Sequence, residues 1–150
     1  GLACAVTAAE RGHKVALFEA DIEIGGQFNL ARRIPGKEDY AETIRYFRNR
    51  LDELGVEVRY GKSASLADLE SGGFDEIVVA TGVRPRHLDI PGADHPSVLT
   101  YVEAITNPAR VGAEIAIIGA GGIGGAPLAP AWRARSVTAR HREIFLRVGN

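Results

Sequence analysis

An apolar run that ends in an acid and is followed by a pair of glycines constrains the fold of this chain most. Residues 14–19 predict a short parallel strand, because an apolar run without alternating polar residues is typical of a strand covered on both faces. The run closes on Glu19, and Gly25 and Gly26 follow. An acid at the end of the second strand of a dinucleotide-binding fold accepts hydrogen bonds from ribose hydroxyls, about 20 residues after the phosphate loop. Glu19 is therefore a candidate ribose ligand, and Gly1 is a candidate last glycine of a GxGxxG phosphate loop.

Helical and strand patterns alternate along the rest of the chain. Apolar residues at helical spacing predict helices over residues 2–11, 40–54, 66–70 and 98–105. Short apolar runs predict strands over residues 56–60, 77–80 and 114–118. Strands that alternate with helices imply a parallel sheet. We therefore expect an α/β chain, with an FAD/NAD(P)-binding Rossmann-like parallel sheet, helices on both faces, and truncation at both ends.

A second glycine-rich loop follows the strand predicted over residues 114–118. Gly119, Gly121 and Gly124 form a GxGxxG pattern, and a preceding strand is the context in which this pattern indicates dinucleotide binding. Two such units imply two dinucleotides, which suits a relay from nicotinamide to flavin. We expect residues 1–90 to form an FAD-binding lobe that lacks its first strand and most of the phosphate loop. A proline-rich linker at 91–112 and the start of an NAD(P)H-binding lobe at 113–150 complete the predicted organisation.

The other residues that carry chemistry are weaker candidates. The turn Ala80-Thr81-Gly82 ends a predicted strand where open α/β sheets bind ligands, and its small residues let a flavin dinucleotide pass close to the backbone. Arg32 follows the glycine pair and fits either a cofactor phosphate contact or a solvated face. Cys4 lies in a predicted apolar helix and is expected in the core. The four histidines show no metal-ligand spacing.

The composition disfavours several kinds of partner. The formal net charge is −1, so no basic surface is expected for nucleic acid or an anionic membrane. The single cysteine forms neither an internal disulfide nor a cysteine cluster, and no segment resembles a signal peptide or a membrane span. We therefore expect a cytoplasmic protein whose ligands are small-molecule dinucleotides.

Most of the chain is similar to one family. The similar segments are Ile24-Gly25-Gly26-Gln27-Phe28-Asn29, Ile34-Pro35-Gly36-Lys37-Glu38, Phe74-Asp75-Glu76, Ala80-Thr81-Gly82, Pro91-Gly92 with Asp94-His95-Pro96, and Ile117-Ile118-Gly119-Ala120-Gly121-Gly122-Ile123-Gly124. Together they resemble the bacterial 2,4-dienoyl-CoA reductases, relatives of trimethylamine dehydrogenase within the old yellow enzyme group. The resemblance implies an N-terminal barrel that binds FMN and the acyl-CoA substrate, an iron–sulfur cluster after it, and C-terminal lobes that hold FAD and NADPH.

The resemblance also implies roles for individual residues. Glu19 would hold the FAD ribose, Gly1 and Leu2 would lie against the pyrophosphate, and Ala64 would lie by the adenine. Gly26, Gln27 and Arg32 would sit along the FAD. The family's substrate-protonating residues and cluster cysteines belong to its N-terminal part, so the resemblance implies no catalytic residue, no metal ligand and no activity for this segment alone.

The similarity stops after Gly124. Pro127 and Pro130 fall where the family continues an apolar helix, and arginines then break any core periodicity. A shifted reading frame is one hypothesis that would explain this tail. Three other interpretations remain open: an amine dehydrogenase or other old yellow enzyme relative, a nucleotide-binding module without a redox role, and a truncated segment with no stable function.

Overall fold

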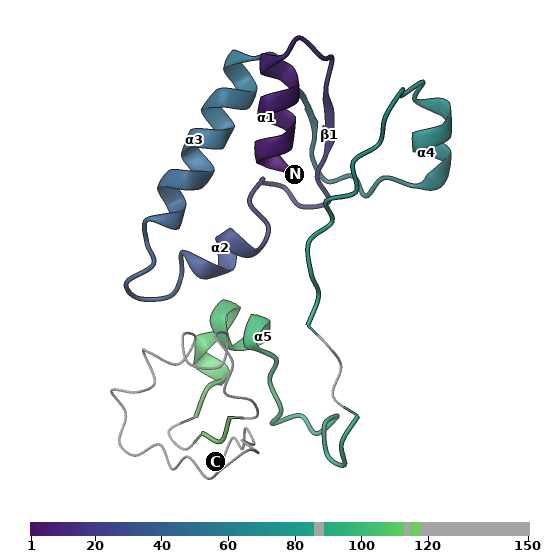
Figure 1. The fold of residues 1–150 in the computed structure, drawn as a ribbon. Helices are drawn as coiled ribbons and strands as arrows, with labels where there is room; N and C mark the ends of the chain where they lie inside the picture. The colour runs from purple at the N-terminus through teal and green to yellow at the C-terminus, as the bar shows by residue number, and fades with distance from the viewer. Residues whose placement is uncertain (86–88, 113–114, 118–150) are drawn as a thin grey trace. The chain divides into compact units, whose positions relative to one another are not determined.

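The computed structural model describes residues 1–85, 89–112 and 115–117 (Figure 1). These residues belong to two compact units. The first unit comprises residues 1–29 and 39–83, and the second comprises residues 30–38 and the described residues from 84 onward. In the described part of the chain, no helix has the length and apolar character needed to cross a bilayer.

The first unit is built around a pair of parallel strands. β1 (Ala16–Phe18) pairs with β2 (Glu57–Arg59) so that Leu17 lies opposite Val58. α1 (Leu2–Glu10) precedes β1, α3 (Tyr40–Glu53) lies between the strands in sequence, and α4 (Leu66–Ser71) follows β2. The predicted parallel arrangement of strands and helices is therefore confirmed. α2 (Gln27–Ala31), which the sequence patterns did not predict, begins in this unit.

The spacing of apolar residues explains why α3 forms where it does. Ile44 and Leu51 are buried and stand two turns apart, so they lie on one face of the helix. Charged residues occupy the positions between them. The helix ends at Glu53, and Gly55 follows with a φ of +64°, a conformation that favours glycine after a helix.

Both faces of the strands are in contact with other parts of the first unit. The core consists of Ala5 and Val6 of α1, Ile24, and Ile44 and Leu51 of α3. Because side chains alternate along a strand, one face packs on this core through Leu17 of β1 and Val58 of β2. Val15 and Val56, which lie two residues before them, pack on the same core.

The opposite face of the strands carries an aromatic and cationic contact. The Phe18 ring meets the Phe74 ring edge-on, with 6.1 Å between their centroids. The guanidinium of Arg59 lies 4.9 Å from the centroid of the Phe18 ring. The segment that follows β2 therefore covers this second face.

The strand predicted over residues 77–80 does not form in the structure. These residues carry no strand assignment and have no strand partner among the residues that the structure describes. Ile77, Val78 and Val79 are 50%, 67% and 80% exposed. An apolar run favours the extended conformation, but a strand also needs a neighbouring backbone to complete its hydrogen bonds. The described residues do not supply that neighbour at this position.

The second unit contains one described α-helix. α5 (Tyr101–Thr106) begins later than the predicted helix, because Thr100 caps it. The Thr100 hydroxyl accepts a hydrogen bond from the Glu103 N–H, and the Glu103 carboxylate accepts from the Thr100 N–H at 2.8 Å, which completes a capping box. The short 3₁₀ helix η1 (Pro108–Arg110) follows. Ile34, Leu99 and Ala104 are the buried apolar side chains described in this unit.

Several predictions fall on residues outside the described part of the chain. Gly119, Gly121 and Gly124 all lie there, as does the arginine-rich tail. Of the strand predicted over residues 114–118, only 115–117 are described, and they carry no strand assignment.

Replacing a buried core isoleucine should destabilise the first unit strongly. We expect Ile44→Ala to lower the free energy of unfolding by about 2–5 kcal/mol, because it leaves a cavity between α1 and α3. Ile22 is 90% exposed and gives a matched control, so Ile22→Ala should change that free energy by no more than about 0.5 kcal/mol. Chemical denaturation measures both, and equal effects would contradict the assigned core.

Acid should uncap α5. The hydrogen bonds from Thr100, and then the charge of Arg110, lower the pKa of Glu103 from its ordinary value of 4.5. Because its pKa is lower in the folded state than in the unfolded state, the ionised carboxylate stabilises the helix. This stabilisation is complete at pH values above the unfolded pKa, and it is lost as the pH falls through the folded pKa. Amide exchange of residues 104–106 should therefore accelerate only below pH 4.5. The acceleration should be absent in Glu103→Gln. An acceleration whose midpoint lies above pH 4.5, the ordinary pKa of a glutamate, would contradict the capping role of Glu103.

Candidate dinucleotide site

Glu19 is held at the carboxyl end of β1 by hydrogen bonds on both sides of its backbone. Its N–H donates to the Arg59 carbonyl at 3.0 Å, and its carbonyl accepts from the Lys62 N–H at 3.0 Å. Its carboxylate Oε1 accepts from the Asp21 N–H at 3.0 Å. The half-buried carboxylate thus stands at the edge of a parallel sheet where α/β folds bind ligands.

Both glycines after β1 adopt a backbone conformation that favours glycine, and Gly25 is also closely packed. Gly25 has a φ of +121°, and a Cβ built there would lie 3.0 Å from Asn29 Nδ2 and from Ile44 Cδ1. Gly26 has a φ of +47° with open space around it. The turn leads into α2, where the Phe28 ring lies 4.7 Å from the Tyr40 ring. Gly25 is therefore required by packing, while Gly26 is required by backbone conformation and is exposed.

The start of α1 lies beside the Ala80-Thr81-Gly82 turn. A Cβ built on Gly1 would contact the Ala80 Cβ at 3.4 Å, and Gly82 has a φ of +73°. The Gly1 carbonyl accepts the first hydrogen bond of α1 from the Ala5 N–H at 2.9 Å. The first N–H groups of α1 have no intrahelical partner, so they are suited to bind phosphate. Leu2 packs on the core and contributes only its backbone here.

Gln27 joins the same region from α2. Its Nε2 donates to the Val83 carbonyl at 3.3 Å, directly after Gly82. The structure thus places Gly1 beside Ala80, and it places Gln27 beside the end of the turn. Ala64 is exposed in the loop that the Lys62 N–H ties to Glu19. Arg32 belongs to the second unit, and its phosphate contact stays a prediction.

Two features of the first unit escaped the sequence patterns. The Asn29 side chain donates to the Ile24 carbonyl at 3.0 Å and so braces the glycine turn. Among the described residues its buried Oδ1 has no hydrogen-bond partner. Asp68 of α4 forms an ion pair with Lys62 at 2.7 Å, next to the loop that holds Ala64. Each contact joins a loop residue to a residue of the helix that follows it, which the spacing of apolar residues does not reveal.

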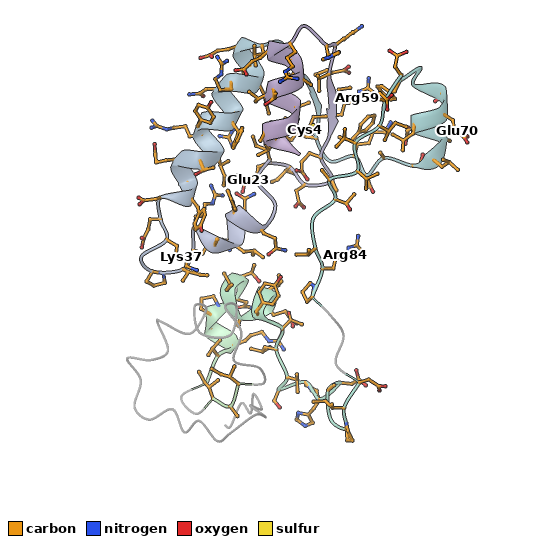
Figure 2. The ribbon with its side chains drawn as sticks, viewed as in Figure 1. Cys4, Glu23, Lys37, Arg59, Glu70 and Arg84 are labelled. Atoms are coloured by element: carbon orange, nitrogen blue, oxygen red, sulfur yellow. The ribbon has the colours of Figure 1, made fainter. Side chains whose placement is uncertain are left out.

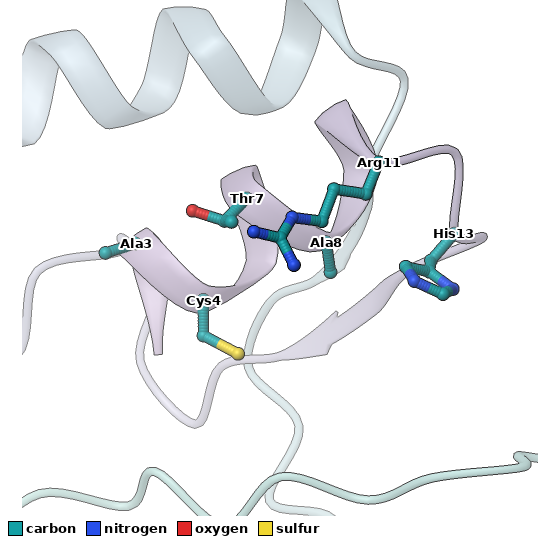
Figure 3. A pocket seen from close by; sticks show the side chains of 6 residues that line it. All are labelled: Ala3, Cys4, Thr7, Ala8, Arg11 and His13. Carbon is teal, nitrogen blue, oxygen red and sulfur yellow. The ribbon is translucent and has the colours of Figure 1, made fainter.

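The prediction that Cys4 lies in the core is wrong. Cys4 is exposed, because α1 turns Ala5 and Val6 inward and leaves its opposite face open. With Arg11 and His13 it lines a hollow of about 430 Å³ on that face, shown in Figure 3. No group of three His, Cys, Asp or Glu side chains suited to a metal occurs within residues 1–85, 89–112 and 115–117.

Comparison with known proteins places the chain among flavin-linked redox enzymes. The family model described as pyridine nucleotide-disulphide oxidoreductase matches residues 1–138. The chain is 34% identical over 128 residues to a metal reductase of Desulforamulus reducens, covering 83% of this chain and 19% of that protein. It is 35% identical over 129 residues to a cinnamate reductase of Clostridium sporogenes, covering 83% of this chain and 18% of that protein. The chain thus spans about a fifth of the length of these relatives.

A solved structure shows the same fold. A 2-naphthoyl-CoA reductase in complex with 2-naphthoyl-CoA matches with a TM-score of 0.79 at 31% identity, covering 84% of this chain and 19% of that chain. Together with the family match, this similarity confirms the predicted α/β FAD- and NAD(P)-binding fold.

The two glycines after β1 should differ in their tolerance of a side chain. Gly26→Ala should lower the free energy of unfolding by about 1–2 kcal/mol, because only the left-handed backbone conformation is strained. Gly25→Ala adds a clash with Asn29 and Ile44 to that strain, so we expect a loss of at least about 3 kcal/mol. Denaturation of the two variants side by side measures the difference, and equal losses would contradict the close packing at Gly25.

Proposed function

Because the chain belongs to the pyridine nucleotide-disulphide oxidoreductase family, we propose that it forms the FAD-binding part of a longer reductase in which electrons pass from NADPH to FAD. The observation that carries this proposal is the contact between the start of α1 and the Ala80 turn. A side chain at position 1 would occupy the space against Ala80. Glycine leaves that space open, and the adjacent N–H groups of α1 favour an anionic group there.

The residues of the first unit fit the two ends of an adenosine diphosphate moiety. Glu19 Oε1 is engaged by the Asp21 N–H, and within the described chain its second carboxylate oxygen has no partner, so it is available to ribose hydroxyls. The N–H groups at the start of α1 would bind the pyrophosphate. Gln27 and the Val83 carbonyl would lie along the part of the FAD that follows the pyrophosphate. A bound flavin would accept a hydride from nicotinamide and release electrons singly or in pairs.

For the whole protein we propose reduction of an unsaturated acyl-CoA, specifically a 2,4-dienoyl-CoA formed during oxidation of unsaturated fatty acids. The similar motifs between Ile24 and Gly124 support this choice. The name of the 2-naphthoyl-CoA reductase adds support, because it is an acyl-CoA reductase with the same fold over this region. FMN, an iron–sulfur cluster and the acyl-CoA site would belong to parts of the protein outside this chain.

Visible absorption of the whole protein tests the proposal. We expect a flavin spectrum that bleaches on addition of NADPH, and we expect the flavin released from the denatured protein to include FAD. Whole protein that releases no FAD would overturn the proposal. Glu19→Gln should weaken FAD binding roughly 10- to 100-fold, because it removes a charged acceptor for the ribose hydroxyls. Glu70→Gln on α4 (Figure 2) removes a carboxylate that the proposal leaves unused, so this control should retain its flavin.

A further inference from the structure

The loop between β2 and α4 is closed by a single carboxylate. Asp68 Oδ1 forms an ion pair with Lys62 Nζ at 2.7 Å, at the start of the loop. Asp68 Oδ2 accepts from the Ser65 N–H at 3.0 Å and from the Ser65 hydroxyl at 2.7 Å, at its end. One side chain therefore fastens both ends of the segment that carries Ser63 and Ala64.

The same loop is tied to the strand that ends in Glu19. The Lys62 N–H donates to the Glu19 carbonyl at 3.0 Å, and the Gly61 N–H donates to the Asp21 carbonyl at 2.9 Å. The Lys62 ammonium also lies 5.9 Å from the centroid of the Phe18 ring, on the face of the strands opposite the core. Lys62 thus joins the Asp68 carboxylate to the backbone that positions Glu19.

The tip of the loop offers unused hydrogen-bonding groups. Ser63 and Ala64 are exposed, and within the described part of the chain neither backbone N–H has a hydrogen-bond partner. An ordered loop with free N–H groups beside a ribose acceptor is suited to contact the adenosine end of a dinucleotide. Ordering the loop before the ligand arrives lowers the entropy lost on binding.

We propose that Asp68 is a positioning residue for the adenosine end of the dinucleotide site, acting through Lys62 and Ser65 to hold the 62–65 loop beside Glu19. The inference rests on the proposed function, because it takes Glu19 as the ribose ligand. Asp68 itself does not touch the nucleotide. The ion pair and the hydrogen bonds from Ser65 lower the pKa of Asp68, which keeps the side chain ionised across the neutral range.

The chain offers a matched control in the second unit. Glu103 occupies the same N3 position in the capping box of α5, accepts from Thr100, and pairs with Arg110 at 3.3 Å. Asp68→Asn and Glu103→Gln therefore remove the same kind of charge from the same kind of helix start. They differ in that only Asp68 is connected to Glu19.

ADP titrated into the whole protein, stripped of bound flavin, tests the proposal. We expect Asp68→Asn and Lys62→Gln each to weaken ADP binding about 10-fold, and the double variant to be no weaker than either single one. Lys62→Arg keeps the ion pair and should bind ADP like the unmodified protein. Glu103→Gln should lower the melting temperature about as much as Asp68→Asn while leaving ADP binding unchanged.

The outcomes separate this inference from the function on which it rests. If Glu19→Gln weakens ADP binding while Asp68→Asn does not, the positioning role is wrong and the dinucleotide site stands. If Glu103→Gln weakens ADP binding as much as Asp68→Asn does, the effect is a general loss of stability, and the positioning role is again wrong. If the unmodified protein does not bind ADP, both the site and the positioning role are overturned.

Discussion

The parallel pairing of β1 with β2 is the constraint on which the first unit depends. Parallel neighbours cannot be joined by a tight hairpin, so the chain must cross from one end of the pair to the other. α3 makes that crossing, and its Ile44 and Leu51 bury the strands' inner face as it does so. Parallel pairing also brings the carboxyl ends of both strands to one edge. That is why Glu19 and the loop after β2 meet, although about forty residues separate them in sequence.

Charged side chains reinforce this arrangement at the surface without forming its core. The described buried residues are all apolar, and the ion pairs lie outside them. Arg50 of α3 pairs with Glu10 of α1 and with Glu53, so it links two helices that already share the core. Exposed pairs of this kind contribute little free energy each. Their value is in fixing which surfaces face one another, as Lys62 does for the loop beside Glu19.

Local patterns predicted most of the elements because the forces that form them act over a few residues. The spacing of Ile44 and Leu51 predicted α3, and the run that ends at Glu19 predicted β1. Long-range contacts decided the rest. The run at 77–80 had the composition of a strand but no described partner, and Cys4 was exposed because α1 buries only one stripe. At the site, Glu19 and the glycine pair were visible in the sequence, whereas the Val83 carbonyl and Asp68 became visible only once the chain was folded.

The exposed run at 77–80 has a consequence for how the chain behaves in solution. Ile77, Val78 and Val79 are β-branched, extended and open to water, which is the composition of a segment that recruits strands from other molecules into aggregates. Two acids, Asp75 and Glu76, stand immediately before it. Charges beside an apolar strand act as gatekeepers, because stacking identical chains would bring like charges together. The solubility of the isolated chain therefore depends on the charges of these two carboxylates.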